Sequence, residues 1–184
     1  MWTFPLDESI FSKISKHAKT AGVIFMILGL VGIIFPTIMT MATVAFVSWL
    51  MLFAGISAAY FTWVSDKSDW LGWLKSILLV GASLFMLLYP MSGVGTVGLL
   101  LSIYFFMDAF AGFGLSSTQY PNKGWWAWLI NALLSLALGV LFLINWPFSS
   151  LYLVGIYVGI SLLFDGIALF STGSFLNKID KGEI

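Results

Sequence analysis

The chain has 184 residues, of which 60% are hydrophobic and only 9% are charged, and its mean hydropathy is +1.02. Soluble proteins are usually about 25% charged, so this composition excludes an ordinary soluble domain and predicts a chain covered by lipid. The formal net charge of zero argues against a nucleic-acid partner, and the absence of cysteine excludes disulfides and cysteine-based metal sites.

The first 19 residues do not have the pattern of a cleaved signal peptide. No positively charged start is followed directly by an apolar core and a small-residue cleavage site. Ile10, Phe11 and Ile14 would share one face of a helix. We therefore expect residues 1–19 to form a short amphipathic helix on the cytoplasmic membrane surface, with a disordered tail as the alternative.

Six stretches are apolar enough to span a membrane, which takes about 20 residues at a rise of 1.5 Å each. They cover approximately residues 20–36, 39–64, 71–90, 93–115, 126–145 and 149–172. We expect an all-α membrane protein with a six-helix transmembrane domain over residues 20–173. Residues 174–184 are expected to form a cytoplasmic tail.

The positive charges lie at alternate connections between these stretches, and arginine is absent. The lysines are Lys13, Lys16, Lys19, Lys67, Lys75, Lys123, Lys178 and Lys181. Because positive residues concentrate in cytoplasmic loops, this distribution predicts that both termini are cytoplasmic. Lys75 lies just inside the third stretch, and we expect its amine to snorkel to the same membrane surface.

Three proline turns reveal an internal repeat. Pro36, Pro90 and Pro147 are separated by 54 and 57 residues, and proline ends or kinks a helix. Small residues recur at fixed distances after each proline. The pattern predicts three copies of one helical hairpin, at about residues 20–64, 71–115 and 126–172, all with the same orientation in the membrane.

The recurring small residues are expected to hold helices together, because helices in lipid associate by close packing. They are Gly55, Gly98, Ser102, Ala109, Gly155, Gly159 and Gly166. We expect the second helices of the three hairpins to pack around a pseudo-threefold axis. Gly155 and Gly159 form a G-x-x-x-G motif, for which packing within the chain is favoured over dimerisation.

Glycine-rich hairpins with a proline turn and a small or Asp-Gly pair in the returning helix resemble the HdeD family of small bacterial membrane proteins. The residues that carry the resemblance are Gly29, Pro36, Ala54-Gly55, Gly81, Pro90, Asp108-Ala109, Gly124-Trp125, Gly139, Pro147 and Asp165-Gly166. The resemblance covers about residues 20–173. It implies a six-span protein of the bacterial inner membrane, associated with acid resistance in enteric bacteria, and it supplies no catalytic residue.

Two aspartates lie within the predicted spans. Asp108 and Asp165 occupy equivalent repeat positions, and Ala54 takes that place in the first repeat. A charged side chain at the centre of a membrane helix costs about 2.5–3.5 kcal/mol on insertion scales, so both carboxyl groups are expected to point into the bundle. If they face each other, they would titrate as a coupled pair.

Two interpretations of these carboxyl groups remain open. In the first, they fix helix packing through hydrogen bonds. In the second, they form a proton-sensing or proton-relaying site with Tyr104 and Ser161, which lie one helical turn earlier on the same faces, and with Asn131 from the fifth span.

No residue pattern indicates an enzyme, a cofactor or a metal site. The leading hypothesis is a non-catalytic HdeD-like protein of the envelope or acid-stress response, whose partners are membrane lipids, other membrane proteins or a second copy of the chain. The alternative is a small transporter or proton-conducting channel that uses the intramembrane carboxyl groups. The sequence does not identify a small-molecule substrate.

Overall fold

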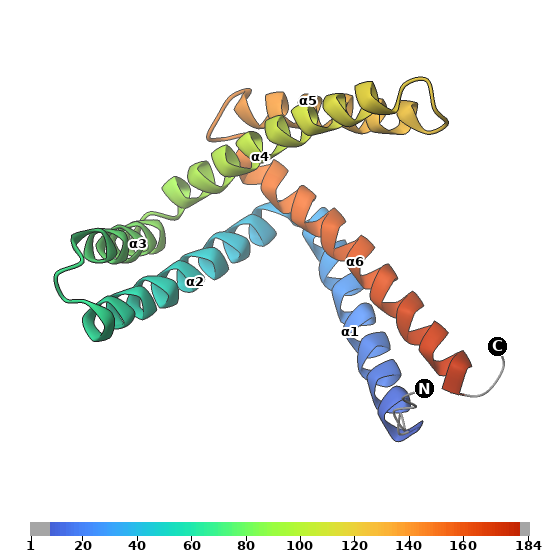
Figure 1. Cartoon of the computed structure of the whole chain (residues 1–184), viewed down its shortest axis with the longest axis horizontal. Helices are drawn as coiled ribbons and strands as arrows, with labels where there is room; N and C mark the ends of the chain where they lie inside the picture. The colour runs from blue at the N-terminus through green and yellow to red at the C-terminus, as the bar shows by residue number, and fades with distance from the viewer. Residues whose placement is uncertain (1–7, 181–184) are drawn as a thin grey trace. The chain divides into compact units, whose positions relative to one another are not determined.

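The computed structural model describes residues 8–180, and it describes side chains for residues 14–176. Residues 8–180 form six α-helices joined by short connections (Figure 1). They are α1 (Glu8–Ile34), α2 (Pro36–Ser65), α3 (Trp70–Leu88), α4 (Pro90–Gln119), α5 (Trp125–Leu143) and α6 (Ser150–Asp180). Residues 8–180 contain no strand. By length and composition, all six helices are able to cross a membrane, which confirms the prediction of six long apolar helices.

Proline determines where two of these helices begin. Pro36 and Pro90 are the first residues of α2 and α4, where the missing N–H removes no hydrogen bond, since the first N–H groups of a helix have no acceptor within it. Pro147 lies in the turn between α5 and α6. Asn145, in the same turn, has a φ of 57°, a left-handed conformation that asparagine tolerates better than most residues.

Two helices, α1 and α6, extend furthest beyond the predicted spans. α1 is continuous from Glu8 to Ile34, so residues 8–19 belong to the same helix as the first predicted span; Ile10 and Phe11 lie outside the described side chains. α6 continues to Asp180, through most of the predicted tail. Both differences have the same cause, because no glycine or proline interrupts residues 8–21 or 174–180.

Large apolar side chains cover the outside of the helices. Leu88 and Phe110 are 74% and 73% exposed, whereas the most deeply buried side chains include small hydroxyl-bearing residues such as Thr40, Ser48 and Ser83. Water would penalise such a surface by about 25 cal/mol for each Å² of exposed apolar area. A hydrocarbon solvent removes that penalty, so the distribution fits a protein surrounded by lipid.

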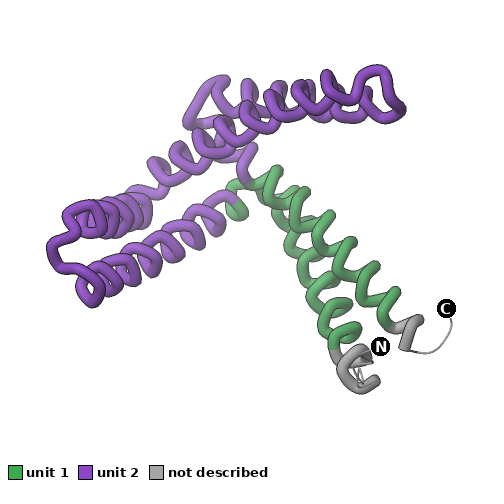
Figure 2. The backbone as a smooth tube through the Cα atoms, viewed as in Figure 1, with its two compact units in different colours: residues 1–39, 155–184 green, residues 40–154 purple. Residues whose placement is uncertain are grey.

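The chain divides into two units (Figure 2). Unit 1 consists of residues 1–39 and 155–184, and unit 2 consists of residues 40–154. In unit 1, α1 and α6 lie side by side and antiparallel. Gly22 contacts Gly166, and Gly29 contacts Gly159. The Ser15 hydroxyl donates a hydrogen bond of 2.7 Å to the Gly173 carbonyl near the ends of the same two helices.

In unit 2, α4 packs along α5 and α2 packs along α3. The Ser102 hydroxyl on α4 donates to the Gly139 carbonyl on α5 at 2.9 Å. Gly55 on α2 lies so close to Val80 on α3 that an added Cβ would approach the valine side chain to 2.8 Å. Small residues therefore allow the close approach of both pairs.

The three packed pairs use equivalent positions. Counted from each proline, the same four places are buried: Val44, Ser48, Gly55 and Thr62 in α2; Gly98, Ser102, Ala109 and Ser116 in α4; Gly155, Gly159, Gly166 and Gly173 in α6. Spacings of four and seven keep these residues on one helix face. Each packed pair is offset by one helix from the predicted hairpins, because α2 packs on α3, α4 on α5 and α6 on α1.

Candidate functional site

Asp108 lies on α4 at the interface with α5 and accepts two hydrogen bonds from the neighbouring helix. The Ser135 hydroxyl donates a short hydrogen bond to Oδ2 of Asp108. The Asn131 side-chain amide donates to the same oxygen at 3.2 Å. The adjacent Ala109 is 1% exposed and packs in the interface, which fixes the face of α4 from which the carboxyl group projects.

The helical spacing of α5 explains why both donors reach one oxygen. Asn131 and Ser135 are four residues apart and therefore lie on the same helix face, one turn from each other. Buried Ala132 lies beside them, and an added Cβ on Gly112 of α4 would approach its side chain to 2.9 Å. Helices α4 and α5 are thus close enough for short polar side chains to form hydrogen bonds between them.

The structure brings Asn131, but not Tyr104, to Asp108. Tyr104 is 54% exposed, and its ring contacts Phe105 with a centroid distance of 5.5 Å. The partners of Asp108 thus come from α5 and not from its own helix. Ser135 was missed by the sequence analysis, although a hydroxyl one turn after Asn131 was the available signal.

Asp165 has a different environment. It is exposed on α6, beside buried Gly166, which packs on Gly22 of α1. No hydrogen bond joins Asp165 to the half-buried Ser161 among the residues that the structure describes. Asp108 belongs to unit 2 and Asp165 to unit 1, so a facing pair of carboxyl groups stays a prediction.

Two glycines make the closest helix contacts. A Cβ on Gly98 of α4 would overlap the side chain of Ser150, whose buried hydroxyl has no hydrogen-bond partner among the described residues. A Cβ on Gly155 of α6 would overlap the backbone carbonyl of Pro36. Any side chain at these two positions forces backbone or a buried residue to move.

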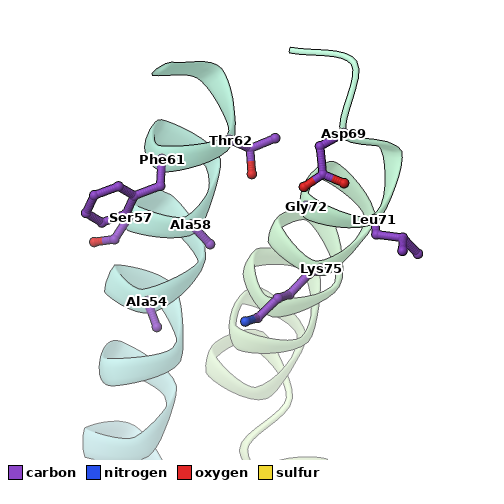
Figure 3. Close-up of a pocket in the computed structure, with 9 residues that line it drawn as sticks. All are labelled: Ala54, Ser57, Ala58, Phe61, Thr62, Asp69, Leu71, Gly72 and Lys75. Atoms are coloured by element: carbon purple, nitrogen blue, oxygen red, sulfur yellow. The ribbon is translucent and has the colours of Figure 1, made fainter. Parts of the chain in front are cut away.

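A second polar region, which the sequence analysis missed, lies between α2 and α3. Lys75 does not extend back toward the start of α3; Figure 3 shows its amine between the two helices, at the level of Ala54. Elsewhere, residues 14–176 bring no three histidine or acidic side chains together in an arrangement able to hold a metal ion.

Comparison with known proteins gives one family. The sequence matches the family described as "Short repeat of unknown function (DUF308)" over residues 20–88, 74–144 and 141–183. The first two matches begin 54 residues apart, which is also the spacing of Pro36 and Pro90. Neither the search of curated proteins nor the search of solved structures found a match. Because the three matches together extend over nearly all of the six helices, the chain belongs to the DUF308 repeat family.

Proposed function

We propose that this protein is an HdeD-like integral protein of the bacterial inner membrane that acts in the envelope or acid-stress response without catalysing a reaction. Both termini would be cytoplasmic, and three helix repeats would surround a pseudo-threefold axis. The protein would act through its surface, by contact with lipids, other membrane proteins or further copies of itself. The exposed apolar side chains and the HdeD resemblance support this proposal.

The observation that carries the non-catalytic role is the bonding of Asp108 between two helices. Ser135 and Asn131 hold its carboxyl group in the α4–α5 interface, and none of the clefts described on the protein is lined by it. Polar contacts of this kind contribute about 0.6 kcal/mol on average between membrane helices, and up to about 2 kcal/mol. A stabilising contact between helices is therefore the simplest role for this carboxyl group.

Survival of a deletion strain in strongly acidic medium tests the stress role. We expect fewer survivors than in the parent strain, and recovery when the wild-type gene or Asp108→Asn is supplied. Asparagine keeps an acceptor for Ser135 but cannot titrate, so it separates packing from proton chemistry. Equal survival of the deletion and parent strains would contradict the acid-stress role.

The alternative function is proton conduction or proton-coupled transport. Asp108 is only half buried and contacts one hydroxyl and one amide, and Asp165 is exposed, so neither carboxyl group is sealed within the helix packing. Purified protein in liposomes with a pH gradient tests this function. Proton flux above that of empty liposomes, lost in Asp108→Asn or Asp165→Asn, would support conduction; flux equal to the background would remove it.

A further inference from the structure

A cleft of about 550 Å³ opens between α2 and α3, next to the connection that joins them (Figure 3). Its width follows from small residues on the facing sides of the helices, Ala54 and Ala58 on α2 and Gly72 on α3. The lining residues are Ala54, Ser57, Ala58, Phe61, Thr62, Asp69, Leu71, Gly72 and Lys75. The cleft thus combines two opposite charges and two hydroxyl groups with an apolar wall.

The polar side chains of the cleft form no hydrogen bond or ion pair within the part of the chain that the structure describes. Asp69 precedes the first residue of α3, where aspartate usually accepts a hydrogen bond from the helix, yet its side chain forms no such bond. In Figure 3 its carboxyl group is turned toward Thr62 and the cleft. By contrast, Ser76 and Ser83, on the buried face of α3, bond to carbonyls of their own helix.

Lys75 also lacks an acidic partner. The structure describes no ion pair between Lys75 and Asp69, which lie at different depths in the cleft. Lys67, in the neighbouring connection, is held over the Trp63 ring at 4.5 Å from its centroid. Lys75 is therefore the positively charged residue that lines the cleft and is available to a ligand.

The α4–α5 pair is the equivalent of the α2–α3 pair in the next repeat, so the residues at the position of Lys75 can be compared. The buried residues of α3 match those of α5 at one constant offset: Ser76 with Ala132, Ser83 with Gly139 and Met86 with Phe142. In this alignment Lys75 takes the place of Asn131. Counted from Pro36 and Pro90, Ala54 takes the place of Asp108. The α2–α3 pair therefore has Lys75 where the α4–α5 pair has Asn131, but it has Ala54, and no carboxyl group, where the α4–α5 pair has Asp108.

The positions of the negative and the positive charge along the cleft indicate which kind of ligand would fit. Asp69 lies at the mouth of the cleft and Lys75 lies deeper, at the level of Ala54. In a phosphoethanolamine headgroup the ammonium is at the outer end, and the phosphate lies deeper, next to the glycerol. Lysine donates charge-assisted hydrogen bonds to phosphate, and a carboxylate accepts them from a primary ammonium. A choline headgroup has no N–H to donate, and a glycerol headgroup has no positive charge.

We infer that the α2–α3 cleft binds the headgroup of phosphatidylethanolamine, with its phosphate on Lys75 and its ammonium on Asp69. The Thr62 and Ser57 hydroxyls supply further donors, and the acyl chains extend over the apolar residues of α2 and α3. This inference rests on the proposed insertion in a membrane, but not on the proposed stress role, because lipid binding is measured without any stress.

Native mass spectrometry of the full chain in detergent tests the inference. Phosphatidylethanolamine, phosphatidylcholine and phosphatidylglycerol with identical acyl chains are added at equal concentrations. We expect phosphatidylethanolamine to be retained preferentially. Lys75→Met should weaken its retention about tenfold, since the variant removes a charge-assisted hydrogen bond to the phosphate. Asp69→Asn should retain phosphatidylcholine and phosphatidylethanolamine equally. Lys123→Met, in the other lysine-bearing connection, should behave as wild type.

A second variant tests the cleft in case Lys75→Met does not fold. Ala54→Asp places an acid opposite Lys75, as Asp108 lies opposite Asn131, and should displace the lipid while the helices stay folded by circular dichroism. Equal retention of the three lipids by the wild type would overturn the inference, as would unchanged retention in both Lys75→Met and Ala54→Asp. Displacement of the lipid by equimolar water-soluble glycerophosphoethanolamine would also overturn it, because the ligand would then be a free headgroup.

Discussion

At the scale of single residues, the helices pack closely because several contact residues are glycines without a side chain. Gly155 of α6 lies against the Pro36 carbonyl, and Gly22 and Gly166 bring α1 and α6 into contact, with neighbouring backbone 2.7 Å from an added Cβ. In water such glycines would weaken a helix by about 1 kcal/mol each relative to alanine. In lipid the cost is offset by the close approach of two helices, so a methyl group at these sites is unfavourable.

Gly155→Ala is therefore expected to destabilise the protein, although alanine favours a helix. The added methyl group would overlap the Pro36 carbonyl, and overpacking of this kind costs about 1–3 kcal/mol. The midpoint of thermal unfolding in detergent measures the effect. Gly114→Ala is the matched control, because an added Cβ at Gly114 meets nothing within 4 Å; its midpoint should stay equal or rise. A Gly155→Ala midpoint equal to that of the wild type would show that this contact contributes little.

The candidate polar site was partly predictable from individual residues. An aspartate and an asparagine in apolar spans stand out, and the structure places Asn131 on Asp108. Tyr104 was chosen because it lies one turn from Asp108 on the same helix, but its ring is exposed. A helix surface offers a carboxyl group few donors of its own, because its N–H groups are already bonded. The missing partner, Ser135, came from the adjacent helix, whose register the sequence does not give.

At the scale of elements, the repeat and the packed pair are different units. The sequence showed six helices through hydropathy and three repeats through Pro36, Pro90 and Pro147. It also showed one small-residue face for α2, α4 and α6. It did not show which helix covers that face, because a row of small residues fits any close neighbour. The contact of α6 with α1, from opposite ends of the chain, was therefore not predictable.

A disulfide across α1 and α6 tests this pairing. The structure predicts that Gly22→Cys and Phe170→Cys cross-link within one chain, because a Cβ on Gly22 lies 3.0 Å from that of Phe170, within about 1 Å of the separation in disulfides. The chain has no other cysteine. With a protease site inserted at residues 120–124, the two fragments should stay joined on a non-reducing gel after cleavage.

The control for this cross-link pairs Val23→Cys with Phe170→Cys. Val23 is 41% exposed and lies on another face of α1, so its thiol should not reach α6. Equal cross-linking of both pairs would indicate random collision. Cross-links found only between two chains would contradict the pairing of α1 with α6 inside one molecule.

At the scale of the whole molecule, the dimensions and surface of the helices fit lipid as the solvent. Helices of 30 residues such as α2 and α4 are about 45 Å long, which matches a bilayer including its interfacial regions. Aromatic residues beside the lysine-bearing connections pack on each other, as in the Trp63–Trp73 and Tyr120–Trp125 ring pairs. Such residues belong at the level of the lipid headgroups.

We expect the six spans to cross the membrane with both termini in the cytoplasm, and labelling of single cysteines from each side of the membrane measures this topology. The chain lacks native cysteine, so each introduced thiol reports one position. With a membrane-impermeant maleimide, Phe35→Cys and Phe148→Cys, at the proline turns, should be labelled in intact spheroplasts. Ser68→Cys and Asn122→Cys, at the lysine-bearing connections, should be labelled only in inverted vesicles. Labelling of Ser68→Cys or Asn122→Cys in intact spheroplasts would contradict this topology.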